Sequence, residues 1–189
     1  KTMGNGKDIA LFRDRVLSLA VSQSGRLLAV GGGDPSREGD VLIWNLDALD
    51  SAPKRFVGVH SDTVLGLSFS PDEKFLVSGG ADKVARVLDI LGMRVVRSLE
   101  GHTHHVLGVS WSPDGRSILT AGADNTVKIW DALNGTRKKS VDGAEKEVTA
   151  VQFLGAGAQF VAASGDGKVR VIAPNGTVSK TISEATFIN

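Results

Sequence analysis

Two short stretches near the middle of the chain hold side chains that could do chemistry. "GHTHHV" at 101–106 supplies three imidazoles, and "ADNTVKIWD" at 123–131 supplies a turn aspartate and a tryptophan. A histidine, a hydroxyl and an aspartate are the groups of a hydrolytic triad. Clustered imidazoles can hold zinc or copper. The stretches therefore raise two candidate chemistries, hydrolysis and metal binding.

Neither chemistry is favoured by the surrounding sequence. A triad nucleophile must face a cleft with an oxyanion hole, and a metal site needs three or four convergent ligands. We expect His104, His105 and His60 to lie on an ordinary surface. The glycine clusters "GNGK", "GGGD" and "SGDGK" lack the spacing and the following helix of a phosphate loop. The sequence predicts a protein that is not an enzyme, with no metal and no cofactor.

Composition excludes several kinds of partner. The 189 residues carry 22 basic and 21 acidic side chains, and the net charge of +1 creates no field that would collect nucleic acid. A basic stripe with interleaved aromatics is absent, as is tyrosine. No apolar run approaches the roughly 20 residues that span a bilayer, so we expect no membrane insertion. The absence of cysteine excludes disulfides, thiolate zinc sites and an attached c-type haem within this segment.

The elements that must position these side chains come from an internal repeat. Four segments align on Val16, Val64, Val106 and Val148, at spacings of 48, 42 and 42 residues. The third and fifth residues after each valine are apolar, which indicates a strand face. The odd step from the valine to the third residue predicts a bulge. The second residue is always small, which suits crowded strands: Ser18, Gly66, Gly108 and Ala150.

Each repeat reads as a meander of four short antiparallel strands. Turns such as "SPDE" and "SPDG" follow the first strand, and two more apolar strands flank the aspartates Asp34, Asp82, Asp124 and Asp166. A fourth strand follows, twice after an Asn-Gly turn, at Asn134-Gly135 and Asn175-Gly176. The extra length of the first repeat comes mainly from an insertion around "PSREG". No segment reads convincingly as a helix, so the sequence predicts an all-β fold.

These residues resemble the WD-repeat family of β-propellers, in which four-stranded blades of about 40 to 45 residues surround an axis. The resemblance implies a hydrogen-bonded network of histidine, hydroxyl, aspartate and tryptophan. The third repeat matches all four places with His102, Thr120, Asp124 and Trp130. The second matches three with His60, Ser78 and Asp82, and has Leu88 for the tryptophan. The first keeps Asp34 and Trp44 with Phe12 at the histidine place, and the fourth keeps only Asp166.

The resemblance implies that residues 1–189 form one propeller segment, with blades at about 8–57, 58–99, 100–142 and 143–184. Propellers have about 4 to 8 blades, and open blade faces would expose apolar surface. We therefore expect four blades that are half of an eight-bladed ring, completed by a second copy as a homodimer. The remainder of a longer protein is the alternative. The segment "DIALF" at 8–12 could add an outer strand at the join.

The loops that precede each first strand predict a partner-binding rim for a protein or peptide. Its residues change from basic to acidic along the chain, which would favour head-to-tail pairing of two copies. The expected rim residues are Arg13, Arg15, Ser61, Thr63, Thr103, His105, Glu145 and Glu147.

A narrower resemblance comes from "LFRDRVLSLAVS", "GGGDPSREGDVLIWN" and "GHTHHVLGVSW". These stretches are similar to the WD-repeat segment of bacterial proteins that also carry a c-type cytochrome region. That resemblance implies a periplasmic setting and a redox-linked module, although a cytoplasmic setting is an alternative. A further alternative is an excised or designed repeat fragment. The favoured hypothesis is a non-catalytic scaffold for protein interactions.

Overall fold

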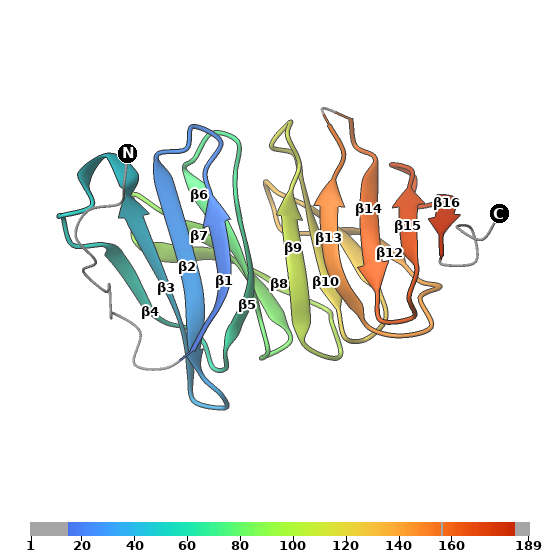
Figure 1. Cartoon of the computed structure of the whole chain (residues 1–189), viewed down its shortest axis with the longest axis horizontal. Coiled ribbons are helices and arrows are strands. Elements are labelled where there is room, and N and C mark those ends of the chain that lie inside the picture. The colour runs from blue at the N-terminus through green and yellow to red at the C-terminus, as the bar shows by residue number, and fades with distance from the viewer. Residues whose placement is uncertain (1–14, 156, 184–189) are drawn as a thin grey trace.

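The computed structural model describes residues 15–155 and 157–183, and their regular structure is almost entirely β (Figure 1). The strands of the first two sheets are β1 (Arg15–Val21), β2 (Leu27–Asp34), β3 (Glu38–Asn45), β4 (Lys54–His60), β5 (Val64–Phe69), β6 (Phe75–Gly80), β7 (Val84–Asp89) and β8 (Arg94–Glu100). Those of the other two are β9 (Val106–Trp111), β10 (Ser117–Gly122), β11 (Val127–Asp131), β12 (Arg137–Val141), β13 (Val148–Phe153), β14 (Phe160–Ser164), β15 (Val169–Ile172) and β16 (Val178–Ile182). A 3-10 turn, η1 (Leu46–Ala48), follows β3.

The strands form four separate antiparallel sheets in chain order, β1–β4, β5–β8, β9–β12 and β13–β16. The expected all-β fold of four four-stranded blades is confirmed. The sheets follow one another along the long axis of the molecule, so that the first and the fourth stand at opposite ends (Figure 1). The described residues therefore form an array of blades and not a closed ring.

We call the first strand of each blade (β1, β5, β9 and β13) the inner strand and the fourth (β4, β8, β12 and β16) the outer strand. Every inner strand contains the bulge that the repeat spacing predicts. The register shifts between Val16 and Ser18, between Val64 and Gly66, and between Val148 and Ala150. In the third blade the shift lies opposite Ala121 and Gly122 on β10. A bulge moves the following side chains to the other face, which explains why the valine and the third residue after it share one face.

The small residue after each bulge lies where neighbouring inner strands come closest. A Cβ added at Gly66 would lie 3.3 Å from the Cα of Gly108, and one added at Gly108 would lie 3.2 Å from the Cα of Ala150. These distances are tighter than ordinary carbon contacts. The predicted crowding of the inner strands is therefore present between the second, third and fourth blades.

The hydrophobic core lies between successive blades. One cluster joins the first and second blades through residues such as Val41, Ile43, Leu67 and Leu88. The second and third blades share a cluster around Val87, Leu99, Trp111 and Trp130. The third and fourth share one around Leu119, Ile129, Phe153 and Phe160. At each of these junctions, the apolar faces of two neighbouring blades bury each other.

At the two ends of the array, part of the sheet face is exposed. On the first blade the exposed part is β1, because Val30, Leu42 and Trp44 on the same face are 8%, 1% and 5% exposed. On β1, Val16, Leu19 and Val21 are 50%, 65% and 60% exposed. Their equivalents on β5 are Val64, Leu67 and Phe69, which are 0%, 9% and 9% exposed because the first blade covers them. On the far face of the fourth blade, Val169 is 37% exposed, whereas the equivalent Val127 is 2% exposed.

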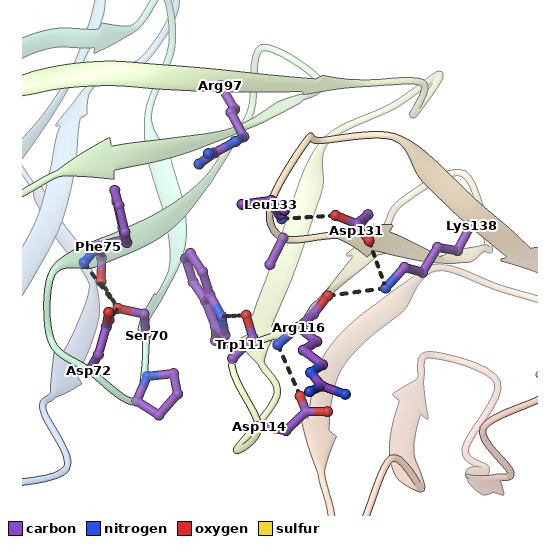
Figure 2. A pocket seen from close by; sticks show the side chains of 13 residues that line it. Ser70, Asp72, Phe75, Arg97, Trp111, Asp114, Arg116, Asp131, Leu133 and Lys138 are labelled. Carbon is purple, nitrogen blue, oxygen red and sulfur yellow. Dashed lines mark hydrogen bonds and ion pairs between the residues drawn. The ribbon is translucent and has the colours of Figure 1, made fainter.

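The strands end at two opposite rims. The "histidine rim" consists of the loops before the inner strands (61–63, 103–105 and 145–147) and the turns at 81–83, 123–126 and 165–168. The "turn rim" consists of the turns at 70–74, 90–93, 112–116 and 132–136. A cavity of about 640 Å³ opens at the turn rim between the second and third blades (Figure 2). The corresponding cavity between the third and fourth blades is about 210 Å³.

Within the described part of the chain, no helix is both long enough and apolar enough to cross a membrane.

Candidate functional site

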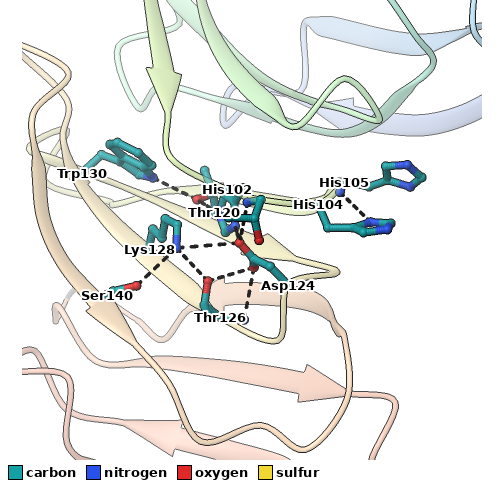
Figure 3. Close-up of polar contacts among 10 residues, drawn as sticks. His102, His104, His105, Thr120, Asp124, Thr126, Lys128, Trp130 and Ser140 are labelled. Atoms are coloured by element: carbon teal, nitrogen blue, oxygen red, sulfur yellow. Dashed lines mark hydrogen bonds and ion pairs between the residues drawn. The ribbon is translucent and has the colours of Figure 1, made fainter.

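The third blade contains a continuous hydrogen-bonded network at the histidine rim (Figure 3). His102 comes from the loop before β9, Thr120 from β10, Asp124 from the β10–β11 turn and Trp130 from β11. The Nδ1 atom of His102 lies 2.9 Å from both carboxylate oxygens of Asp124, and its Nε2 atom lies 2.7 Å from Thr120 Oγ1. The Trp130 indole N–H donates to the same Oγ1 atom at 2.9 Å.

The network is satisfied when the imidazole is neutral. Burial lowers the pKa of His102 below its ordinary value of 6.5, and this outweighs the opposing effect of Asp124. The Nδ1–H group then donates to the carboxylate, and Nε2 accepts from the Thr120 hydroxyl. That hydroxyl oxygen accepts from the indole, so each of these buried polar groups has a partner.

Asp124 is held in its charged form by donors from several elements. Burial alone would raise the pKa of the carboxyl, but hydrogen bonds from the Thr103 N–H and from His102 outweigh burial and hold the pKa below its usual range. Lys128 Nζ lies 3.8 Å from the carboxylate and donates to Thr126 Oγ1 at 2.9 Å. The turn aspartate therefore ties the loop, the turn and β11 together.

A cation that the sequence analysis missed accompanies the turn aspartate in three blades. Arg86, Lys128 and Arg170 each stand four residues after the aspartate of their blade and form an ion pair with it. In the fourth blade the pair is bidentate, with N···O distances of 3.2 and 2.6 Å. The repeated basic residue at this spacing in "ADKVAR", "ADNTVK" and "GDGKVR" is the signal that could have identified it.

The second blade has a shorter form of the network. His60 Nδ1 lies 2.9 Å from Asp82 Oδ1, and Nε2 lies 2.8 Å from Ser78 Oγ. Leu88 supplies no indole donor. Arg86 Nη1 instead lies 2.7 Å from Asp82 Oδ2 and 2.6 Å from His60 Nδ1. Burial lowers the pKa of His60, and the Arg86 charge acts in the same direction.

The first and fourth blades lack the network and use other pairs. In the fourth, the Arg170 hydrogen bond holds the pKa of Asp166 well below its usual range, and the place of the tryptophan is taken by the buried Ile172. In the first, Asp34 forms an ion pair with Arg37 at 3.1 Å, and Trp44 is buried. Phe12, expected at the histidine place, lies outside the described residues.

The network has no geometry for hydrolysis. The Thr120 and Ser78 side chains are fully buried at 0% exposure, and each hydroxyl is already a partner of an imidazole. A nucleophile must reach a substrate and an oxyanion hole. The arrangement instead fixes the loop before the inner strand against the sheet, which is a structural role.

The expected rim residues lie in different environments. Ser61 and Thr103 are exposed, and their main-chain N–H groups donate to Asp82 and Asp124. Thr63 differs from the expectation: it is 4% exposed and its hydroxyl donates to Asp62, so it is not available to a partner. His105 is half-buried, with its N–H donating to His104.

The charged rim residues are separated in the structure. Arg15 is exposed at the start of β1, and Arg13 lies outside the described residues. Glu145 forms an ion pair with Lys168 at 2.6 Å within its own blade, and Glu147 is half-buried. Glu145 is thus already partnered by a lysine, which weakens the proposed attraction between this acidic loop and arginines of a second copy.

The imidazoles do not converge on one point, and His60, which was expected on the surface, is buried at 1% exposure in the network of its blade. The His104 and His105 rings contact each other at a tilt of 53°, with centroids 4.4 Å apart, and point away from the network in Figure 3. Across residues 15–155 and 157–183, no group of three or more His, Cys, Asp or Glu side chains could hold a metal ion.

A family profile described as "WD domain, G-beta repeat" matches residues 6–45, 52–89, 93–131 and 135–172. The matches cover more than half of the chain, and the chain therefore belongs to the WD-repeat family. The matched units are offset from the sheets by one strand. The unit 93–131, for example, contains β8 of the second blade and β9 to β11 of the third.

The chain is also similar to Cilia- and flagella-associated protein 52 of Chlamydomonas reinhardtii. The two are 40% identical over 79 residues, which is 40% of this chain and 12% of that protein. The chain thus matches a small part of the length of this relative. Neither the family profile nor this relative adds support to the resemblance to cytochrome-linked proteins.

Proposed function

We propose that this WD-repeat chain is a non-catalytic protein-binding scaffold whose array of blades is completed by a second copy. The exposure of Val16, Leu19 and Val21 carries the proposal, because the equivalent residues of the second blade are buried. Soluble proteins rarely leave a contiguous row of apolar side chains uncovered, as these residues of β1 are. A blade of the same kind has the shape and the chemistry to cover it.

The contacts at the internal blade junctions indicate how two copies would fit. The main-chain N–H of Trp111 donates to Ser68 Oγ of the preceding blade at 3.0 Å, and the main-chain N–H of Phe153 donates to Ser110 Oγ at 3.3 Å. In the next step of this series, the exposed Gln152 of the fourth blade would accept from the Val21 N–H of a second copy. Both groups lie on the open end faces.

A lysine on the outer strand also forms a hydrogen bond to the next blade. Lys54 Nζ donates to the main-chain oxygen of Ile90 in the next blade at 2.9 Å, and Lys139 Nζ donates to that of Asn175. Lys180 occupies the equivalent place on β16, opposite Val171. It would reach the β3–β4 connection of a second copy.

The test is the molar mass in solution of the full chain and of two matched variants. Light scattering across concentrations of about 1 to 100 µM should give the mass of a dimer at the upper end. Leu19→Glu places a charge on the open face and should leave a monomer. Leu91→Glu makes the same change at a leucine that is 87% exposed on the turn rim, and it should still dimerise.

Two outcomes would overturn the proposal. A monomer at every concentration would exclude self-completion and favour further blades supplied by a longer protein. A dimer that survives Leu19→Glu would place the contact on another surface. Circular dichroism of both variants separates a loss of association from a loss of folding.

The histidine rim stays our prediction for the contact with a protein or peptide partner, through the exposed Ser61 and Thr103 and the half-buried His105. The hypothesis of a cytochrome-linked module depends on the three stretches quoted above. A Cys-x-x-Cys-His motif in sequence adjoining this segment would favour it.

A further inference from the structure

The junction between the second and third blades differs from the other internal junctions. Each outer strand carries a cation opposite the middle of the third strand: Lys54 opposite Ile43, Arg97 opposite Val87 and Lys139 opposite Ile129. Lys54 and Lys139 bond to a main-chain oxygen in the next blade. Arg97 makes no such bond, and its guanidinium carbon lies 5.9 Å from the centroid of the Phe75 ring.

A cavity opens where the bond between blades is missing. It measures about 640 Å³, against about 210 Å³ at the next junction, where Lys139 makes its bond. One wall is aromatic, since the Phe75 and Trp111 rings stack with centroids 6.3 Å apart at an interplanar angle of 16°. Leu133, which is 80% exposed, lies across from them, and Arg97 extends from β8 toward the space between (Figure 2).

The acidic side chains around the cavity already have donors. Asp72 accepts from the Ser70 hydroxyl at 2.6 Å, and Asp114 accepts from the Ser112 hydroxyl at 2.6 Å. Asp131 accepts from two main-chain N–H groups and forms an ion pair with Lys138 at 3.1 Å. Arg97 and Arg116, by contrast, have no hydrogen bond or ion pair from their guanidinium groups among the described residues. Of these two, Arg97 is the one that lies over the Phe75 ring of the apolar wall. The cavity therefore offers an apolar wall and, beside it, a guanidinium with no acidic partner.

We propose that this cavity binds a linear peptide that presents an aromatic side chain next to a carboxylate. The aromatic ring packs against Trp111, Phe75 and Leu133, and the carboxylate forms a bidentate pair with Arg97. Arginine suits this role because its planar donors match the two carboxylate oxygens. The site is separate from the open blade faces, so it extends the scaffold function and does not depend on dimerisation.

The test is a titration of the full ¹⁵N-labelled chain with small probes, followed through the Trp111 indole N–H signal. N-acetylphenylalanine carries the ring and a terminal carboxylate, and N-acetyl-Phe-Asp-amide carries the ring and a side-chain carboxylate. At least one should shift the Trp111 signal, and the tighter of the two identifies the source of the carboxylate. N-acetylphenylalanine amide, which lacks the charge, should bind at least about tenfold more weakly.

Variants on one strand provide the control. Arg97→Gln should weaken binding of the charged probe about tenfold. Arg94→Gln removes the same charge from β8 at a side chain that is 72% exposed and pairs with Asp89, and it should bind as the wild type does. Equal binding of the acid and the amide, an unchanged affinity in Arg97→Gln, or no shift at Trp111 with either charged probe would overturn the proposal. An unchanged molar mass of Arg97→Gln keeps this result distinct from the test of dimerisation.

Discussion

At the scale of single residues, the hydroxyl at the centre of the network decides whether the buried donors are satisfied. Thr120 stands between an imidazole and an indole, whereas Ser78 stands beside an imidazole only. A buried polar group that loses its partner retains the full cost of leaving water. The third blade therefore gains more from its hydroxyl than the second does.

Thr120→Val should destabilise the protein by about 2 to 4 kcal/mol, because it leaves both His102 Nε2 and the indole N–H of Trp130 without a partner. Thr120→Ser keeps the hydroxyl, as in the second blade, and should cost only about 1 kcal/mol for the lost methyl group. Urea unfolding measures both. A valine variant no less stable than the serine variant would contradict the role assigned to the hydroxyl.

The two buried imidazoles make stability depend on pH. Both pKa values are lowered by burial, so below about pH 6.5 the unfolded chain binds protons that the folded chain does not. Stability should be full above that pH and should fall as the pH decreases, by up to about 1.4 kcal/mol per pH unit for each histidine. Urea unfolding between about pH 7.5 and 5.5 tests this above the range where carboxylates titrate. A flat profile there would count against neutral, buried histidines.

At the scale of elements, the close approach of the inner strands sets the size of the residue after each bulge. Gly108 on β9 would place a Cβ 3.2 Å from the backbone of β13. Backbone atoms cannot move aside as a flexible side chain can. The position therefore tolerates small residues only.

Gly108→Val should destabilise the protein by about 2 to 3 kcal/mol through overpacking, and Gly108→Ala by about 1 kcal/mol or less. Gly157→Val is the control, since a Cβ there has no neighbour closer than 3.9 Å. Thermal unfolding of the three variants compares them. Equal effects at the two sites would show that the loss of glycine's backbone freedom, and not strand crowding, governs the change in stability.

Much of this level of structure could be predicted from the sequence. The spacing of Val64 to Leu67 indicates the bulge, and the four network residues of the third blade could be located because they match the places implied by the resemblance to the WD-repeat family. The cations Arg86, Lys128 and Arg170 were missed, because a basic residue on a strand reads as solvated surface until its aspartate is placed. Burial of Thr63 escaped prediction as well, since its main-chain N–H and its hydroxyl both bond to Asp62, which the sequence pattern does not indicate.

At the scale of the whole molecule, the blades behave as a one-dimensional array in which each contacts only its neighbours. The two middle blades have a neighbouring blade on both faces, and the two end blades have one on a single face. Stability should therefore be lowest at the ends. The insertion in the first blade lengthens β2 and β3 without changing the order of the strands.

Amide hydrogen exchange should reveal this gradient. Amides of β10 and β6 should exchange slowest, and those of β1 and β15 fastest when the protein is dilute. Raising the concentration should slow exchange in β1 and β15 selectively if a second copy covers the end faces. Uniform exchange across the four blades would show that they unfold as one unit.

The offset between the family's repeat units and the sheets has a genetic consequence. A deletion of residues 93–131 would remove β8 together with β9, β10 and β11, and β12 would then stand where β8 had been, beside β7. Every remaining sheet would keep four strands, and its third strand would still be paired on both sides. Gain or loss of whole units during evolution can thus lengthen or shorten such a protein. Each unit still spans two neighbouring blades, so the chain keeps them connected.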